Sequence, residues 1–131
     1  MNTKLSKILA EISAGELLDK ITILEIKKDK IKDKEKLKDV DKELKSLSAT
    51  SQEKIPDKSK VDDLIIKLKK INFRLWDIEE SKRLAEKNQK FDDEFIKLSR
   101  DVYKTNDDRA KIKLKINQIL ESNIKEVKSH Y

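Results

Sequence analysis

The stretch SAGELLDKITILEIKK, Ser13 to Lys28, decides the fold class of this chain. It holds six large apolar residues in the ten positions from Leu17 to Ile26, within a chain otherwise dominated by charged residues. Ser13 and Glu16 have the spacing of a capping box, in which the Ser hydroxyl accepts from the N3 amide and the Glu carboxylate returns to the N-cap amide. The pattern therefore predicts an amphipathic helix that begins at Ala14.

Composition extends the helical prediction to the whole chain. Of the 131 residues, 44% are charged and 36% are hydrophobic, against roughly 25% charged in average globular proteins. Long amphipathic helices suit such a chain because each needs only one apolar stripe. The single Gly and single Pro agree, since sheets and tight turns use these residues and helix interiors exclude them. We expect an all-α fold and a single helical domain over residues 1–131.

Apolar periodicity divides the N-terminal two thirds of the chain into two long helical segments. The first runs from residue 14 to about residue 46, with one change of register between Ile31 and Leu37. Residues 46–58 are the expected connection, because they collect Ser, Thr, Gln and the only Pro. The second segment starts at Asp57 or Ser59. Together the two segments predict an antiparallel, coiled-coil-like hairpin over about residues 14–89.

The C-terminal part predicts further helix over about residues 92–128. Asp92 is placed as an N-cap, and Thr105 resembles a second one, so YKTNDDRAK is either a kink or a break between two helices. An apolar face continues to Val127. The expected fold is therefore an antiparallel bundle of three to four helices, preceded by residues 4–12 as either a short helix or an extended lead-in.

Three segments stand out because helix periodicity alone does not dictate their order of residue types. They are GELLDKITILEIK (15–27), LWDIE (75–79) and TNDDRAKIKLKIN (105–117). In this order and at this chain length they resemble a small uncharacterised bacterial family, known only as a domain of unknown function. Members of that family often have Pro where this chain has Ala14, a residue that suits the first helical position. The resemblance covers nearly the whole chain and implies that the three segments belong together.

Charged, amide and aromatic residues in and near these segments fall at helical spacing beside the apolar faces. We interpret these stripes either as ordinary helix borders or as the walls of a pocket between helices, a place where helical bundles build sites. In the pocket hypothesis Lys20, Arg109 and Lys113 hold an anionic small molecule and Trp76 stacks on a ring. The candidate pocket residues are Lys20, Trp76, Glu79, Arg83, Asn106, Arg109, Lys113 and Asn117.

Acidic residues in or next to the first two segments are weaker candidates for a metal site, namely Asp19, Asp77 and Glu80. Glu16 and Asp19 form an E-x-x-D pair, and Mg²⁺ prefers several oxygen ligands. Such pairs occur by chance in a chain with 26 acidic residues, and the charge of Lys20 between the acids opposes a cation. No cofactor is predicted, and Mg²⁺ enters only with the alternative function given below.

Several classes of site are excluded by residue counts. The absence of Cys excludes thiolate nucleophiles and zinc thiolate sites, and a single His, His130, excludes a His-based triad. The only glycine, Gly15, cannot supply a glycine-rich phosphate loop. Residues 1–60 and residues 61–131 each carry a net charge of +3, and only four of the 32 basic residues are Arg. This even distribution argues against nucleic-acid binding, which uses clustered Lys and Arg.

The location expected for the chain is the cytoplasm. Its first residues lack the apolar region of a signal peptide, and no uncharged run approaches the roughly 18 residues of a membrane span.

The function expected is a non-enzymatic helical binding or assembly module. A homodimer or another protein partner would bury apolar stripes that a thin core leaves open. The alternative is a small-molecule or Mg²⁺-dependent enzyme acting on a phosphorylated or nucleotide-like ligand held between helices. The two differ in one respect, because the enzyme requires the charged stripes to face each other and the module does not.

Overall fold

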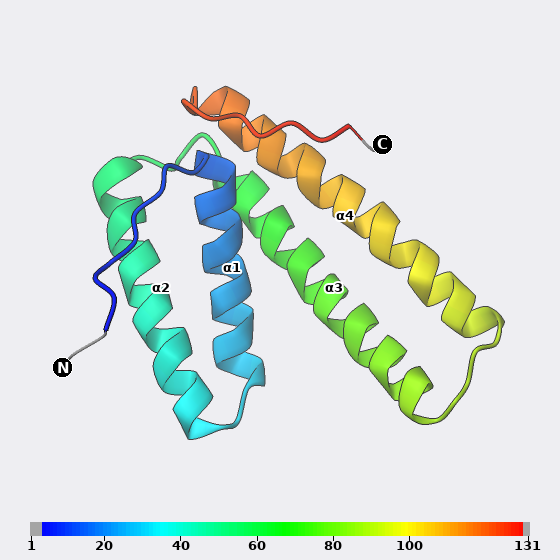
Figure 1. Cartoon of the computed structure of the whole chain (residues 1–131). Coiled ribbons are helices and arrows are strands. Elements are labelled where there is room, and N and C mark those ends of the chain that lie inside the picture. Colours follow the sequence, from blue (N-terminus) through cyan, green and yellow to red (C-terminus); the bar gives the residue numbers. More distant parts are fainter. Residues whose placement is uncertain (1–3, 130–131) are drawn as a thin grey trace.

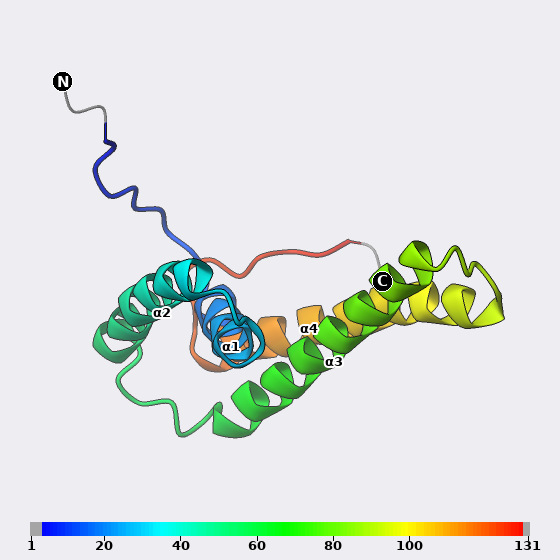
Figure 2. The same cartoon turned by 90° about the horizontal axis from the view of Figure 1, so that it is seen from below.

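The computed structural model describes residues 4–129, which form four α-helices and no strand (Figure 1). The helices are α1 (Ala14–Lys30), α2 (Lys34–Lys54), α3 (Asp62–Lys87) and α4 (Asp93–Ile119). They pair as two hairpins, α1 with α2 and α3 with α4 (Figures 1 and 2). The all-α prediction is confirmed. Within this range no helix has the length and apolar character needed to cross a bilayer.

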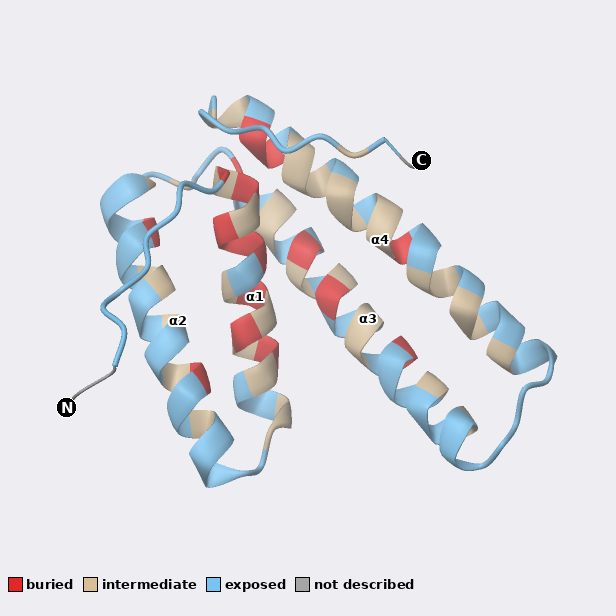
Figure 3. Ribbon diagram, in the orientation of Figure 1, coloured by how far each residue is buried: buried red, intermediate tan, exposed pale blue. Residues whose placement is uncertain are grey.

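Helix α1 is the central element of the fold. It contacts each of the other three helices, whereas α2 contacts α1 alone among the described helices. Seven of the 17 residues of α1 are buried, against two of the 21 in α2 (Figure 3). The main apolar cluster consists of Leu18, Val61, Leu68 and Ile116, with partly buried side chains of α3 and α4 packed around it. The segment that decides the fold class therefore also forms its centre.

The long first helix predicted from the sequence is two helices in the structure. Helix α1 ends at Lys30 and α2 begins at Lys34, so the first antiparallel hairpin spans residues 14–54 and not 14–89. The carboxylate of Asp33 caps α2 by accepting from the amides of Glu35 and Lys36 at 2.9 and 3.3 Å. These bonds satisfy amides that have no partner within the helix. The change of register after Ile31 marks this break.

The predicted connection over residues 46–58 is wrong on its N-terminal side. Helix α2 continues to Lys54, and residues 55–61 connect it to α3. Asp57 does not start a helix, because its carboxylate accepts from the amide of Ser59 at 3.0 Å inside the connection. Helix α3 begins only after Val61, which makes no side-chain cap but is fully buried in the core. Burial, and not capping, fixes this boundary.

Helix α4 is continuous through the segment that predicted a kink or a break. Asp92 caps it as predicted, accepting from the amide of Phe95 at 3.2 Å. Thr105 is buried within the helix and caps nothing. The helix ends at Ile119, so the predicted helix is wrong from residue 120 onwards, and Val127 is 92% exposed instead of packed. Residues 4–12 form no helix and leave the bundle as an open lead-in (Figure 2).

The ends of α3 and α4 are formed without glycine. Gln89 and Glu121 take left-handed backbone conformations, with φ of 55° and 52°. The amide after each one returns to a carbonyl in the last turn of the helix, as in a Schellman motif. These bonds run from Lys90 N to Ala85 O at 2.9 Å and from Ser122 N to Asn117 O at 2.8 Å. Since Gly is the usual residue at such positions, the sequence carried no stop signal there.

The only glycine of the chain lies where α1 meets α4. A Cβ atom at Gly15 would lie 2.6 Å from the backbone oxygen of Lys113 and 2.9 Å from Oδ1 of Asn117. The amide of Gly15 donates to that same Oδ1 at 2.6 Å. Glycine is therefore required here for the close approach of the two helices.

We expect Gly15→Ala to lower the free energy of unfolding by about 1–3 kcal/mol, the usual effect of overpacking. Helix propensity alone predicts the opposite sign, a gain of up to about 1 kcal/mol. Urea denaturation distinguishes the two. Ala49→Gly, at an exposed position inside α2, is the control and should lose about 1 kcal/mol through propensity alone. A Gly15→Ala variant more stable than the parent chain would contradict the close approach.

Candidate functional site

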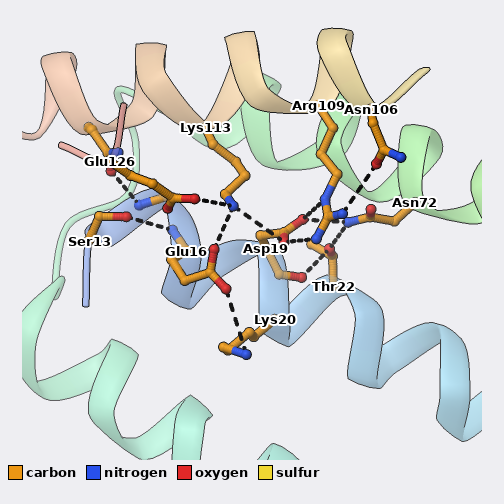
Figure 4. A network of polar contacts seen from close by, with 12 residues as sticks. Ser13, Glu16, Asp19, Lys20, Thr22, Asn72, Asn106, Arg109, Lys113 and Glu126 are labelled. Atoms are coloured by element: carbon orange, nitrogen blue, oxygen red, sulfur yellow. Dashed lines mark hydrogen bonds and ion pairs between the residues drawn. The ribbon is translucent and has the colours of Figure 1, made fainter. Parts of the chain in front are cut away.

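A ladder of polar contacts joins α1 to α4, and Figure 4 shows most of it. Its rungs pair Gly15 with Asn117, Glu16 with Lys113, and Asp19 with Arg109. Residue numbers rise along α1 while they fall along α4, so the two helices are antiparallel. We call these three pairs the α1–α4 ladder. Each rung takes one residue from the first sequence motif and one from the third, so the ladder brings these two motifs together.

The carboxylate of Asp19 is fully buried and accepts hydrogen bonds from two other helices. Arg109 donates to both of its oxygens, with Nε 3.0 Å from Oδ1 and Nη2 bonded to Oδ2. Asn72 of α3 donates to Oδ1 at 2.8 Å, and Nζ of Lys113 lies 3.9 Å from Oδ2. A buried carboxylate needs such donors because it has lost its water. Asp19 therefore ties α1 to both α3 and α4.

Further polar side chains complete the network around Asp19. The side-chain amide of Asn72 also donates to Oγ1 of Thr22 at 2.9 Å, and that hydroxyl donates to the backbone oxygen of Asp19 at 2.8 Å. On α4, Oδ1 of Asn106 accepts from Nη1 of Arg109 at 3.4 Å. The guanidinium is thus held from its own helix as well as from α1.

The ion pair between Glu16 and Lys113 stabilises the charged form of both side chains. Partial burial opposes ionisation of Glu16, but the hydrogen bond and the charge of Lys113 outweigh it and place the pKa of Glu16 below its ordinary value. Burial also opposes the charge on Lys113, but the Glu16 hydrogen bond and the Asp19 charge raise its pKa. The hydrogen bond to Asp19 likewise raises the pKa of Arg109. All these groups are charged at neutral pH.

The ladder and the charged residues at its edge, Lys20 and Glu126, together carry no net charge. Nζ of Lys113 also lies 3.3 Å from Glu126, and Lys20 lies 3.6 Å from Glu16. Three cations therefore face three carboxylates: Lys20, Arg109 and Lys113 against Glu16, Asp19 and Glu126. The cluster presents no excess positive charge to an incoming anion.

The N-terminus of α1 is satisfied within the chain. The amides of Ala14 and Glu16 donate to Oγ of Ser122 at 3.0 Å and to Oγ of Ser13 at 3.1 Å, and Gly15 donates to Asn117 as described above. The Ser13 half of the predicted capping box is confirmed. The Glu16 carboxylate bonds to Lys113 across the helix interface. The amides that could bind an external anion are thus occupied.

A second feature, an apolar groove, lies on α3 beside the ladder. It has a volume of about 440 Å³ and is walled mainly by apolar surface. Its lining residues are Ile23, Asn72, Leu75, Trp76, Glu79, Glu80, Arg83 and Arg109. The indole N–H of Trp76 donates to Glu80 at 3.0 Å. We call this feature the Trp76 groove.

The structure divides the predicted pocket residues into two groups. Trp76, Glu79, Arg83 and Arg109 line the Trp76 groove. Asn106, Lys113 and Asn117 lie in or beside the ladder, and Lys20 pairs with Glu16 at its rim. The three cations that were predicted to hold an anion are paired with carboxylates of the same chain.

The metal candidates are not brought together. Among residues 4–129 no group of three or more Asp, Glu or His side chains is placed to hold a metal ion. Asp19 is occupied by Arg109 and Asn72, and Glu80 accepts from Trp76. Asp77 lies on the exposed side of α3.

Several residues of the network were not among the predicted site residues, including Thr22, Asn72, Ser122 and Glu126. Thr22 and Asn72 did carry a signal, because each is a polar residue next to large apolar ones in a helix that must bury a face. Ser122 and Glu126 follow the end of α4, where the sequence predicted more helix.

A small all-α protein held together by a buried polar network is the class that these features define. The chain belongs to a family of unknown function, DUF6165, whose family model matches residues 8–131. The resemblance found from the sequence is thereby confirmed, and the matched range contains all three motifs. No curated protein and no solved structure matches the chain.

We expect Asp19→Ala to lower the free energy of unfolding by about 3 kcal/mol, the lower end of the range for breaking a buried ion pair, because the Arg109 side chain keeps 27% of its surface exposed. Asp29→Ala, at an exposed position of the same helix, is the matched control and should change stability by about 0.5 kcal/mol or less. Chemical denaturation measures both. Equal effects of the two substitutions would contradict the buried network.

A dependence on pH follows from the lowered pKa of Glu16. Such a group stabilises the fold above its ordinary pKa of 4.5, and this stability is lost as the pH falls through the lower folded value. Glu16→Gln should therefore be less stable than the parent chain at neutral pH, and the difference in melting temperature should shrink below about pH 4.5. Thermal melts of both proteins at a series of pH values test this. Glu43→Gln, an exposed control on α2, should follow the parent chain throughout.

Proposed function

We propose that this protein is a non-enzymatic assembly module of the cytoplasm that pairs with a second copy of itself. The observation that carries the proposal is the contrast between its charged and its apolar surfaces. The charges that resembled a site are paired within the chain, whereas large apolar side chains lie open to solvent on the N-terminal segment and on α3, which also carries the apolar Trp76 groove.

The electrostatics of the ladder support a structural role over catalysis. A general acid or base works best with a pKa near the operating pH, and enzymes shift their carboxylates up and their lysines down to reach it. Here the pKa of Glu16 is lowered and that of Lys113 is raised, so both move away from neutrality. The buried ion pairs hold helices together, and this role explains both shifts.

The exposed apolar side chains support association. Leu5, Ile8 and Leu9 are 78%, 82% and 89% exposed, and Phe73 and Leu84 of α3 also belong to the exposed set. Contiguous apolar surface marks interaction sites on proteins, and Leu5, Ile8 and Leu9 lie within five residues of the chain. The same chain carries both an apolar groove and an apolar segment that leaves the bundle, so a second copy offers a partner for each.

We expect light scattering to show the mass rising from one chain to two as the concentration increases from about 5 to about 500 µM, the range that covers micromolar dissociation constants. Because the contacts are apolar, added sodium sulfate should strengthen the dimer. Sodium chloride should not weaken it, since screening also reduces the repulsion between two chains of net charge +6. A single-chain mass over the whole range would overturn the proposal.

A further inference from the structure

The N-terminal segment KLSKILAEI, residues 4–12, has the pattern of an amphipathic helix. Its apolar residues, Leu5, Ile8, Leu9 and Ile12, fall at positions i, i+3, i+4 and i+7 and would form one stripe. Ser6, Lys7, Ala10 and Glu11 would lie on the other side. In the structure the segment is not helical and its stripe lies open to solvent. A helix of this length is marginal alone, since isolated helices shorter than about 12–15 residues rarely hold in water.

The segment leaves the bundle in a direction that takes it away from the Trp76 groove of the same chain (Figures 1 and 2). Glu11 accepts a hydrogen bond from Nδ2 of Asn123, which follows α4, so the segment starts at the end of the bundle where α1 begins. From there it runs past α2 and out of the bundle, on the side away from α3 (Figures 1 and 2). The groove on α3 is therefore not covered by the segment of the same chain.

The Trp76 groove has the character that such a segment needs. Ile23, Leu75 and Trp76 supply apolar walls, and the charges at its border balance, with Glu79 and Glu80 beside Arg83 and Arg109. The apolar stripe of the segment would face these walls, and Lys7, on the opposite side of the helix, would stay in water. An amphipathic helix laid in an apolar groove is a common way in which proteins recognise a helical peptide.

We infer that residues 4–12 of one copy dock as a helix in the Trp76 groove of a second copy, and that reciprocal exchange of the two segments closes a symmetric dimer. The inference rests on the proposed self-assembly and names the surfaces that carry it. Two segments and two grooves are used up in the pair, so the assembly stops at two chains and does not grow into a filament.

The single tryptophan of the chain provides a direct readout, because Trp76 lines the groove. Docking of apolar side chains removes water from the indole, so the emission maximum of the parent chain should move to shorter wavelength as the concentration rises. This shift should follow the same concentration dependence as the mass measured by light scattering.

Ile8→Glu combined with Leu9→Glu places two charges on the apolar stripe of the segment. We expect this variant to raise the dissociation constant of the dimer at least about 30-fold, the effect of losing one strong interface contact, and to abolish the emission shift. Ser6→Glu combined with Ala10→Glu adds the same charge on the opposite side and is the matched control. It should retain both the dimer and the shift.

Substitution in the groove tests the other half of the inference. Trp76→Ala should behave like the segment variant. A mixture of Trp76→Ala with the Ile8→Glu and Leu9→Glu chain should form a mixed dimer, because one intact segment then meets one intact groove.

The outcomes separate this inference from the assembly proposal. If the parent chain dimerises but the segment variant dimerises equally well and the emission does not move, the docking inference is wrong and self-assembly stands. If the parent chain stays monomeric, both are wrong. If the segment variant changes the emission of a monomer at the lowest concentration, the segment docks in its own chain and the exchange is excluded.

Discussion

The buried carboxylate of Asp19 is the constraint on which the rest of the structure depends. An ionised group without water is stable only with several donors in fixed geometry, and those donors come from Arg109 on α4 and Asn72 on α3. Apolar side chains tolerate small displacements of one helix along another, whereas a two-pronged guanidinium contact does not. In a chain with so thin a core, this one group fixes the register of three helices.

Much of the architecture follows from sequence patterns, and the remainder depends on contacts that no local pattern contains. Ser13 and Asp92 marked the starts of two helices, and the periodic apolar residues of the second predicted helical segment included Val61 and Leu68, which reach the core. The pairing of Asp19 with Arg109 was not predictable, because both lie at a helix border where a solvated residue and a buried one look alike. The burial of Asp19 depends on α3, whose Asn72 donates to its carboxylate, and no local pattern around Asp19 contains this contact. The ends at Gln89 and Glu121 were missed because left-handed caps normally carry glycine.

The distribution of charge bears on the proposed pairing of two copies. Helix α2 fully buries only Val40 and Ser51 and leaves most of its charged side chains in water, so one flank of the molecule is hydrophilic. Two copies with a net charge of +6 also repel each other, so the proposed pairing must rely on apolar surface. The ladder contributes to this indirectly. By neutralising its own charges beside the Trp76 groove, it leaves that border without a strong field of one sign.

The wide sequence separation within the ladder also orders the steps by which the chain folds. Each hairpin can close from neighbouring residues, but Asp19 meets Arg109 across 90 positions and Gly15 meets Asn117 across 102. During synthesis α1 and α2 emerge long before α4 exists. Until then Asp19 keeps its hydration shell, and the face of α1 that carries it resists collapse onto any apolar surface lacking a matching cation. The charge of Asp19 therefore opposes burial of this face of α1 until α4 has been synthesised and Arg109 can pair with it.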